Sequence, residues 1–349
     1  MSIRLFIFAS LFLASLPLVF AADPLHFDGE KHLANVKQLT FGGQNAEAYF
    51  SMDNKSLIYQ STGDSFQCDQ IFTMDTDGSH RHLVSTGHGA CTCSFFIPGT
   101  DDVIFSSTHE KALECPKKPD RSLGYVWGLF DFEIYRAKRD GSNLRRLSNA
   151  HGYDAEAAVS PDGKEIVFCS GRDGDLELYK MNVDGSHVQR LTYTVGYDGG
   201  PFFSPDGKYI VYRAFHPRNP TELTKWNTLW SSQAVSPVRL ELWIMNRDGT
   251  SQRQLTELGG ASFCPYMGPD GQWIIFTTDF ADTSKGGMPN FDLYRIHPDG
   301  SGLEQITFSP MFEGFPMWSF DGKKLVFCSG RGVTKAPHET NIFIADWVE

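Results

Sequence analysis

The chain has 349 residues, of which 31 are Lys or Arg and 42 are Asp or Glu, so its formal net charge is −11. This acidic balance, without a run of Lys and Arg, argues against nucleic acid or an anionic membrane surface as the partner. Hydrophobic residues make up 41% of the chain and charged residues 21%, which excludes a disordered protein and allows a large core.

The N-terminus has the pattern of a secretory signal peptide. Arg4 precedes an almost wholly apolar run at 5–20, and small residues favour cleavage after Ala21. The run is short for a membrane span, although an uncleaved anchor is the alternative, and no later stretch could cross a bilayer. We therefore expect a signal peptide at 1–21 and, at 22–349, a single periplasmic or secreted domain that is monomeric.

The remaining chain repeats one unit six times, most clearly at 154–192. Each unit contains two tight turns, and the second turn is Asp-Gly at five places: Asp77-Gly78, Asp140-Gly141, Asp184-Gly185, Asp248-Gly249 and Asp299-Gly300. At a fixed distance after each, a Ser or Thr ends a short β-like segment: Ser85, Ser148, Thr192, Thr256 and Thr307. Asp-Gly supplies the positive-φ positions that hairpins need. Each unit is therefore predicted to contain four short antiparallel strands, named a to d in chain order.

The sixth copy lacks its last strand. It covers strand-like segments at 315–320, 324–327 and 341–346, and the chain then ends. The missing pattern stands at the N-terminus, where Asp28-Gly29 precedes an apolar segment at 36–40. We therefore expect an all-β fold, a six-bladed β-propeller of four-stranded antiparallel blades, whose ring is closed by the N-terminal strand joining the last blade. This closure leaves no open sheet edge.

Two motifs carry a family resemblance. Ser-Pro-Asp-Gly-Lys and Leu-Tyr-x-Met-Asn-x-Asp-Gly-Ser-x-x-x-x-Leu-Thr, clearest at 160–192 and 204–256, make the chain resemble the TolB-like propeller repeat family. The resemblance covers essentially the whole mature chain and implies interaction with an envelope protein. We expect no counterpart of the α/β domain that precedes the TolB propeller, because the repeat begins by residue 28. The same repeat also occurs in prolyl-oligopeptidase-type hydrolases and in propeller lyases acting on oligogalacturonate.

Every long insertion is predicted between strands b and c, on the face that we call the long-loop face. The insertions are 107–131, 214–239, 279–290 and 332–340. Long loops grouped on one face of a rigid scaffold usually carry function. Two insertions are rich in aromatic residues, including Trp127 and Trp226, which suits a lid, a sugar-stacking platform or a protein contact. The alternative is that these rings only pack the loops onto the blades.

Alignment of the six copies predicts a polar ring at the mouth of the central channel. Six residues fall at the start of strand a: Asn45, Cys91, Asp154, Asp198, Ser262 and Glu313. Two residues further along lie Glu47, Cys93, Glu156, Gly200, Cys264 and Phe315. His88 and His151 precede the first position in neighbouring blades. These groups could bind a divalent cation such as Ca²⁺ or Mn²⁺, with both histidines as ligands, or they could only make hydrogen bonds between blades around water. No other cofactor is expected.

Two arginines and two cysteines are further candidates. Arg172 and Arg331 follow the same Cys-Ser-Gly sequence at the exit of strand b, where they could bind a carboxylate or a uronate. The alternative is pairing with local acids such as Asp173. The odd number of Cys residues, seven, leaves at least one free, and Cys68 and Cys115 are the first candidates for a disulfide because they lie in b–c regions of adjacent blades.

No motif for nucleophilic catalysis or phosphate binding is present, so no catalytic residue is expected. The predicted function is an exported, non-catalytic TolB-like propeller that binds an envelope or extracellular protein, a peptide or an oligosaccharide on its long-loop face and at the channel mouth. The candidate ligand-binding residues are Asn45, Glu47, Asp154, Glu156, Asp198, Glu313, Arg172, Arg331, Trp127 and Trp226. The alternative is a metal-dependent, lyase-type enzyme acting on acidic oligosaccharide.

Overall fold

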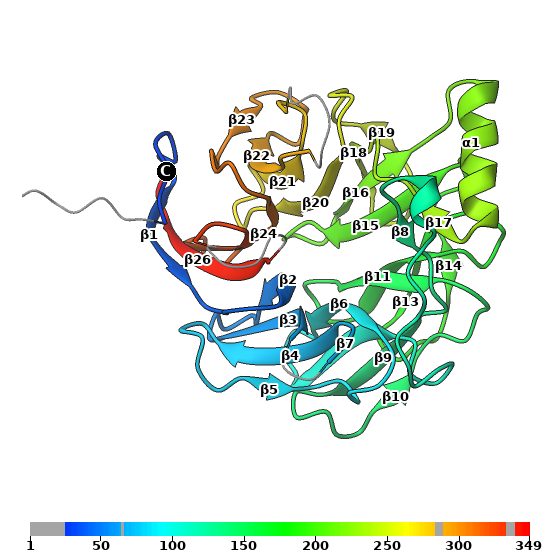
Figure 1. The fold of residues 1–349 in the computed structure, drawn as a ribbon, viewed down its shortest axis with the longest axis horizontal. Coiled ribbons are helices and arrows are strands. Elements are labelled where there is room, and N and C mark those ends of the chain that lie inside the picture. Colours follow the sequence, from blue (N-terminus) through cyan, green and yellow to red (C-terminus); the bar gives the residue numbers. More distant parts are fainter. Residues whose placement is uncertain (1–24, 64–65, 283–288, 333–338) are drawn as a thin grey trace, which may run out of the picture.

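The protein was analysed as a computed structural model, which describes residues 25–63, 66–282, 289–332 and 339–349. The predicted signal peptide lies outside the described residues. Six four-stranded antiparallel sheets surround a central axis as the blades of a propeller, which confirms the predicted fold (Figure 1). The innermost strands a are β2 (Gln44–Phe50), β6 (Cys91–Phe96), β11 (Asp154–Val159), β15 (Tyr197–Phe203), β20 (Ser262–Met267) and β24 (Glu313–Trp318).

The outer strands follow in the same order around the ring. Strands b are β3 (Ser56–Thr62), β7 (Asp102–Ser107), β12 (Glu165–Ser170), β16 (Tyr209–Phe215), β21 (Ile274–Thr278) and β25 (Lys324–Ser329). Strands c are β4 (Gln70–Asp75), β9 (Glu133–Lys138), β13 (Glu177–Asn182), β18 (Glu241–Asn246), β22 (Asp292–Ile296) and β26 (Asn341–Trp347). Strands d are β5 (His82–Leu83), β10 (Arg145–Arg146), β14 (Gln189–Arg190), β19 (Arg253–Gln254), β23 (Glu304–Gln305) and, from the N-terminus, β1 (Leu33–Gln38).

The ring closes as predicted. β1 pairs antiparallel with β26, with Leu33 opposite Trp347 and Gln38 opposite Phe343. The sixth blade therefore consists of the last three strands and the first strand of the described chain, as the blue and red strands show in Figure 1.

The core lies between neighbouring blades. Strands b read as nearly continuous apolar runs because blades cover both of their faces. In β12, Ile166, Val167, Phe168 and Cys169 are each 0% exposed. Burying one large apolar side chain of this kind contributes about 1.5–3 kcal/mol, so the stacked blades account for much of the stability.

A polar contact repeated in all six blades explains the Ser or Thr that ends strand d. In the third blade, Thr192 donates to the Glu177 carboxylate, and the backbone N–H of Leu178 donates to the Thr192 hydroxyl at 2.9 Å. The other five blades repeat the contact with the hydroxyls of Thr40, Ser85, Ser148, Thr256 and Thr307. The hydroxyl thus satisfies a buried polar side chain and a backbone donor together, at the junction of strands c and d.

The glycines of the second turns are needed for two reasons. Gly141 has a φ of +78°, and a Cβ atom there would lie 2.6 Å from the carbonyl oxygen of Val84 in the preceding blade. Gly185 has a φ of +89° and makes the same approach to Leu147, at 2.7 Å. A side chain at either position would be strained and would push two blades apart.

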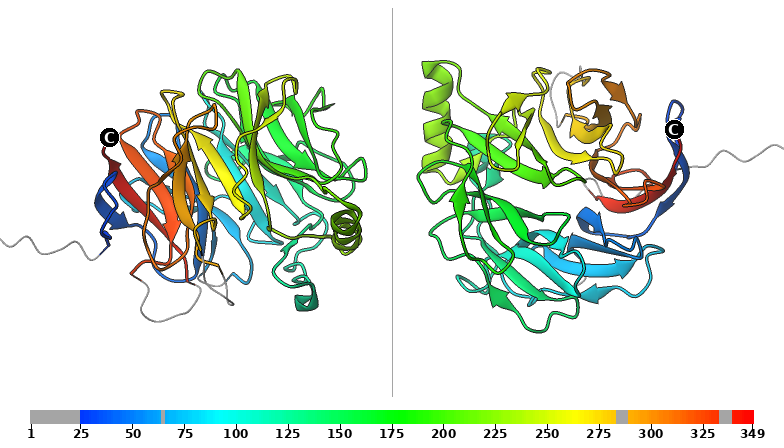
Figure 2. Two further views of the ribbon diagram at one scale, coloured as in Figure 1. Left: turned by 90° about the horizontal axis from the view of Figure 1, so that it is seen from above. Right: turned by 180° about the vertical axis from the view of Figure 1, so that it is seen from behind.

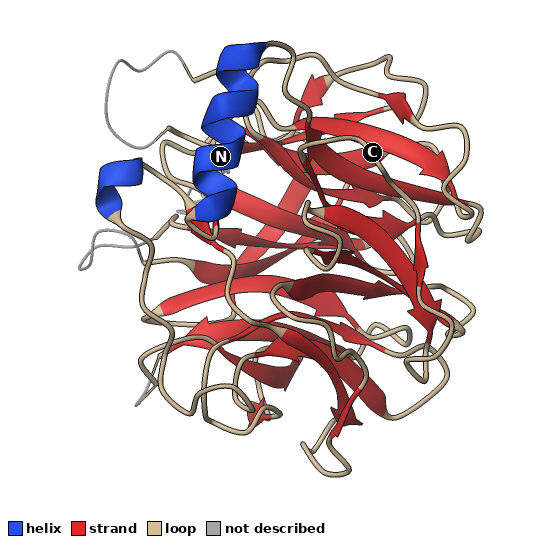
Figure 3. Ribbon diagram, turned by 90° about the vertical axis from the view of Figure 1, so that its right-hand side faces the viewer, coloured by secondary structure: helices blue, strands red, loops and turns tan. Residues whose placement is uncertain are grey.

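The insertions of the second and fourth blades meet above the third. The second contains a short 3₁₀ helix (Arg121–Leu123) and β8 (Trp127–Gly128), and the fourth contains α1 (Pro220–Ser231) and β17 (Ala234–Val235). β8 and β17 pair antiparallel, so the two insertions form one bridge. Both helices project on the same side of the propeller, which is the long-loop face (Figures 2 and 3).

The helix α1 is a departure from the expected all-β chain. The side chain of Asn219 accepts a hydrogen bond from the backbone N–H of Glu222, Pro220 occupies the first turn, and the Glu222 carboxylate accepts from the N–H of Arg218. This resembles a capping box, except that Glu222 binds the residue before the N-cap, and Pro stands at the start of the helix. Among the described residues, no helix is long and apolar enough to cross a membrane.

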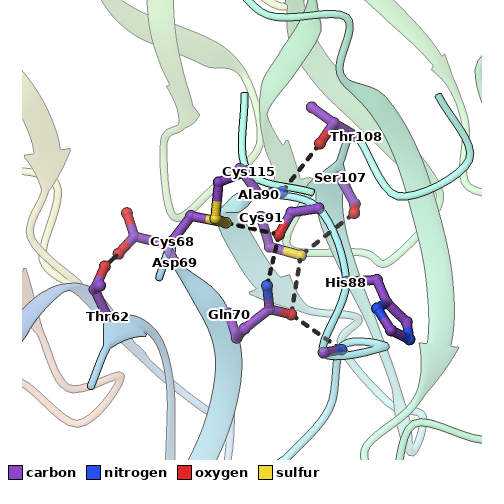
Figure 4. Close-up of a disulfide and its surroundings, with 12 residues drawn as sticks. Thr62, Cys68, Asp69, Gln70, His88, Ala90, Cys91, Ser107, Thr108 and Cys115 are labelled. Carbon is purple, nitrogen blue, oxygen red and sulfur yellow. Dashed lines mark hydrogen bonds between the residues drawn. A yellow bond between two sulfur atoms is a disulfide. The ribbon is translucent and has the colours of Figure 1, made fainter. Parts of the chain in front are cut away.

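The predicted disulfide is confirmed. Cys68 and Cys115 are bonded, with 5.8 Å between their Cα atoms (Figure 4). The bond ties the b–c connection of the first blade to the insertion of the second. Five cysteines are free: Cys91, Cys93, Cys169, Cys264 and Cys328.

Candidate functional site

Each strand a contains a β-bulge at the second of the two aligned positions. The bulge residues all have positive φ values between +50° and +59°: Glu47, Cys93, Glu156, Gly200, Cys264 and Phe315. The strand a to strand b register shifts beside each of them. Five of these six residues are not glycine, so each of the five holds a backbone conformation that L-residues seldom adopt. The bulge is therefore part of the propeller repeat, whatever side chain it carries.

An ion pair joins two neighbouring blades at this level. The Arg213 guanidinium donates to Glu156 Oε1 at 2.8 Å, and the hydroxyls of Tyr153 and Tyr197 donate to the same oxygen at 2.9 and 2.7 Å. Arg213 is 7% exposed. Sequence reasoning missed it, although an arginine inside the otherwise apolar β16 was a visible signal. A buried pair with this many hydrogen bonds holds the two blades in register.

Glu47 and Cys93 also face this group. Burial raises the pKa of Glu47 from 4.5 to about 7, with a hydrogen bond from Cys93 and the charge of Arg213 opposing the rise. Burial, followed by the nearby carboxylates Glu47 and Glu156, raises the pKa of Cys93 well above its ordinary value. The Cys93 side chain is consequently a thiol at neutral pH and not an activated nucleophile.

Aromatic rings meet across the axis below these residues. The ring centroids of Tyr49 and Phe95 lie 5.6 Å apart, and those of Tyr49 and Phe202 also lie 5.6 Å apart. Tyr266 completes the group at 5.7 Å from Phe202. Tyr49 and Phe202 come from the first and fourth blades, which face each other across the ring. The strand a side chains thus pack on one another through the centre of the propeller at this level.

The first aligned position forms separate local contacts within blades. In five blades its side chain bonds a Ser or Thr at the end of strand b, namely Asn45 with Ser61, Cys91 with Ser107, Asp154 with Ser170, Ser262 with Thr278, and Glu313 with Ser329. In the fourth blade, Asp198 instead contacts His216 Nε2 at 3.0 Å. The aligned residues are buried. The contacts described above join strand a to strand b within each blade, and they do not converge on one shared point.

The two predicted anion-binding arginines are engaged with acids of the chain. Arg172 contacts Asp154 Oδ2 at 2.9 Å. Arg331 contacts Glu30 at 2.8 Å and Glu313 at 2.7 Å, with all three side chains fully buried. The partner of Arg172 is therefore the acid at the start of strand a and not Asp173, which sequence analysis offered.

The predicted histidines are exposed on the long-loop face. His88 lies in the loop between β5 and β6, and in Figure 4 its ring lies apart from the disulfide. His151 lies in the loop before β11. Within residues 25–63, 66–282, 289–332 and 339–349, no group of three or more His, Cys, Asp or Glu side chains is arranged to hold a metal ion.

The two predicted tryptophans have different surroundings. Trp127 is half-buried, lies over the Arg213 guanidinium at 5.3 Å, and contacts the Phe263 ring edge to face at 5.7 Å. Trp226 is 3% exposed and packs between Phe215 and Trp230. Trp226 consequently anchors α1 to the blade below it, whereas Trp127 covers the buried ion pair.

A cavity of about 390 Å³ lies where the bridge of the two insertions crosses the third blade. Its lining combines the bridge, the end of α1 and the loops of the third blade: Leu129, Asp131, His151, Gly152, Tyr153, Gly171, Trp230 and Gln233. The backbone N–H of Leu129 donates to the carbonyl of Gln233 at 2.8 Å, which holds the two insertions together at the rim. Of the predicted residues, only His151 lines this cavity.

Comparisons with known proteins agree with this architecture. The family model for the TolB beta propeller domain matches residues 130–236. The chain carries the TolB-like propeller repeat. An uncharacterised protein of Agrobacterium fabrum is 34% identical over 89 residues, which make up 26% of this chain and 28% of that protein. The chain thus matches about a quarter of the length of this curated relative.

Two solved structures share the TolB-like fold. One described as TolB from Agrobacterium tumefaciens aligns with 90% of this chain and 97% of its own, at a TM-score of 0.61 and 18% identity. An oligogalacturonate lyase in complex with manganese aligns with 91% of this chain and 94% of its own, at a TM-score of 0.52 and 12% identity. Identities this low show a common fold, and one fold carries many functions.

Most of the cavity in this TolB-like propeller was not predicted from the sequence. Asp131, Tyr153 and Gln233 come from three separate parts of the chain, and no repeat aligns them. The backbone bond from Asp154 to Phe132 places Tyr153 beside Asp131, and the pairing of β8 with β17 brings Gln233 to them. Two-residue strands inside long loops leave no periodic signal.

Proposed function

We propose that this chain is an exported, non-catalytic TolB-like propeller that binds its ligand on the long-loop face. One observation carries the proposal. Ten of the fifteen large apolar side chains exposed in the described part of the chain lie in b–c or d–a connections, which all open on that face. They are Phe41, Leu113, Tyr125, Tyr193, Val195, Leu223, Val238, Phe280, Phe308 and Met311.

The distribution matters because single exposed apolar residues are normal on a protein surface, whereas apolar residues gathered on one face indicate an interaction site. The turns of the opposite face contribute few such residues, including Val188 and Leu303. The bridge formed by β8 and β17 adds a fixed, raised rim to the long-loop face. A rigid scaffold with varied loops on one face is the usual arrangement for recognition of a partner. We infer that the ligand is an envelope or extracellular protein, peptide or glycan.

Paired substitutions on the two faces test the proposal. Wild-type protein and a Tyr193→Ser/Val195→Ser variant are used to capture ligand from envelope extract, with Val188→Ser/Leu303→Ser as the matched control on the opposite face. We expect capture to fall only for the long-loop variant. Equal capture by all three proteins would contradict the proposal. Treating the extract with protease beforehand separates a protein or peptide ligand from a glycan.

The metal-dependent lyase alternative has a direct test. We expect the purified mature protein to contain no stoichiometric metal and to leave oligogalacturonate intact. Bound metal that is lost in a His151→Ala variant, together with cleavage of oligogalacturonate, would replace the binding proposal with the enzyme. Sequencing the N-terminus of exported protein tests the remaining part, since cleavage after Ala21 leaves Ala22 first.

A further inference from the structure

Three polar side chains around the cavity over the third blade have no protein partner. Within the described parts of the chain, the Asp131 carboxylate, the His151 imidazole and the Gln233 amide make no hydrogen bond or ion pair. Asp131 comes from the insertion of the second blade, His151 from the loop before β11, and Gln233 from the segment that follows α1. A cavity with a few convergent polar groups and aromatic walls is the usual form of a small-ligand site.

The apolar wall of the cavity is held in place before any ligand arrives. The Trp230 ring stacks on Trp226 at 6.3 Å between centroids. A Cβ atom on Gly171 would lie 2.8 Å from Trp230 Cη2. Glycine at this position therefore leaves room for the edge of the Trp230 indole. Tyr153 is fixed from the other side by its hydrogen bond to Glu156. Immobilised rings lose little further entropy when a ligand packs against them.

The presence of Gln rather than Gly at position 233 indicates that the side chain has a function. Gln233 follows the end of α1 with a φ of +52°. Glycine is the residue that helices most often place at such a position, and another residue costs about 1 kcal/mol there. The backbone contacts of Gln233, to Trp230 and Leu129, need no side chain. The amide is therefore available to the cavity at a conformational cost that glycine would avoid.

The lining selects a neutral, hydroxylated ligand. It contains no Lys or Arg, and Asp131 would repel a phosphate, a carboxylate or a uronate. A cation would meet only one carboxylate in this lining, that of Asp131. Hydroxyl groups can donate to Asp131 and can both donate to and accept from Gln233 and His151. The C–H faces of a sugar ring suit Trp230 and Tyr153.

We propose that this cavity binds one or two pyranose units of a neutral oligosaccharide. The inference rests on the proposed function, because the cavity opens on the same long-loop face, and it names the chemical class of a ligand there. The volume of about 390 Å³ lies near the lower end of the range for ligand sites, which is about 300–1,000 Å³, so the cavity suits a small group rather than a folded domain.

Tryptophan fluorescence and calorimetry with defined sugars test the inference. The probes are maltotriose, cellotriose, mannotriose and N,N′,N″-triacetylchitotriose, with trigalacturonate and tetramethylammonium as charged controls. We expect saturable binding of at least one neutral trisaccharide at concentrations up to about 10 mM. We also expect Gln233→Gly to weaken that binding roughly tenfold, as loss of one hydrogen bond predicts, while its melting temperature stays the same or rises.

Ser251→Gly is the matched control. Ser251 is exposed on the opposite face with a φ of +57°, so the change relieves the same backbone conformation away from the cavity. Binding should be unchanged in this variant. No binding of any neutral sugar, equal binding by Gln233→Gly, or binding of a charged control instead would overturn the inference. If sugars fail while the Tyr193→Ser/Val195→Ser variant still loses captured protein, only this inference fails and the proposed function stands.

Discussion

Two polar regions of the third blade are built in opposite ways. Where strands c and d join, Glu177 and Thr192 are buried, and each has a partner supplied by the same repeat. At the cavity above, Asp131, His151 and Gln233 are exposed and have no partner among the described residues. Polar residues that recur in every blade thus stabilise the propeller, and exposed polar residues that occur once and have no protein partner are the candidates for ligand contact.

Removal of the strand that closes the ring should have the largest effect. A chain starting at residue 41 loses β1, so the edge of β26 is left without its partner. We expect aggregation and loss of cooperative unfolding, measured by size-exclusion chromatography and circular dichroism. A chain starting at residue 22 is the control and should behave as the mature protein does. A monomeric, cooperatively folded product starting at residue 41 would show that the closure is dispensable.

Disrupting the buried ion cluster of Arg331, Glu30 and Glu313 should have the second-largest effect on stability. Arg331→Met leaves Glu30 and Glu313 together in the interior without their cation. Removing one partner of a buried pair costs about 3–5 kcal/mol, which urea unfolding would measure. Arg172→Met is the comparison, because the Arg172 side chain is 20% exposed, so its removal should open Asp154 to water. We expect a smaller loss there, and equal losses would contradict the importance of burial.

Loss of the disulfide should affect the long-loop face more than the ring. Cys68→Ser/Cys115→Ser releases a connection across 47 residues, and such a bond stabilises by about 2–4 kcal/mol. Because the bond joins a b–c connection to an insertion, proteolysis should become faster at 107–131 while the blades stay protected. Cys91→Ser is a control, since burial raises the pKa of that thiol to about 11 and keeps it unreactive. Faster cleavage throughout the blades would contradict the local role.

The smallest effect expected is a change in the pH dependence of stability. Burial raises the pKa of Glu47 from 4.5 to about 7, so between these values the folded state binds more protons than the unfolded state. This carboxyl therefore makes stability fall as pH rises from about 4.5 to about 7, with no further change above. Cys93, Arg213, Glu156 and Asp69 also act on it, but burial is the largest cause.

Glu47→Gln should remove this part of the slope. We expect the variant and the wild type to have similar stability near pH 4.5 and the variant to be more stable above pH 7, by urea unfolding at each pH. Glu257→Gln, at an exposed carboxylate, is the control. Parallel pH profiles for the wild type and Glu47→Gln would contradict the assignment.

The fold was predictable because a propeller repeats its own construction. Asp-Gly turns such as Asp184-Gly185, and the Ser or Thr that follows them, recur because every blade needs the same turn and the same hydroxyl. The closing strand could be recognised since a strand is missing at one end and present at the other. Even the disulfide followed from the order of the b–c connections.

The ring alignment was informative about position but not about chemistry. It brought Asp154 and Glu313 to equivalent places, where each carboxylate binds the arginine that follows strand b of its own blade. A single sequence cannot distinguish such internal pairing from ligand binding, because both need the same residue types. The cavity could not be predicted from the sequence for another reason. It depends on how two long insertions pair, and neither insertion resembles the repeat.

The contact between β1 and β26 also has a consequence for when the fold can be completed. The first strand of the described chain to be synthesised has as its partner the last, more than 300 residues later. Blades one to five are each continuous in sequence and can form as they emerge, whereas the sixth requires both ends of the chain. We therefore expect ring closure to follow synthesis of the last strand, and we expect an unfinished chain to expose unpaired strand edges until then.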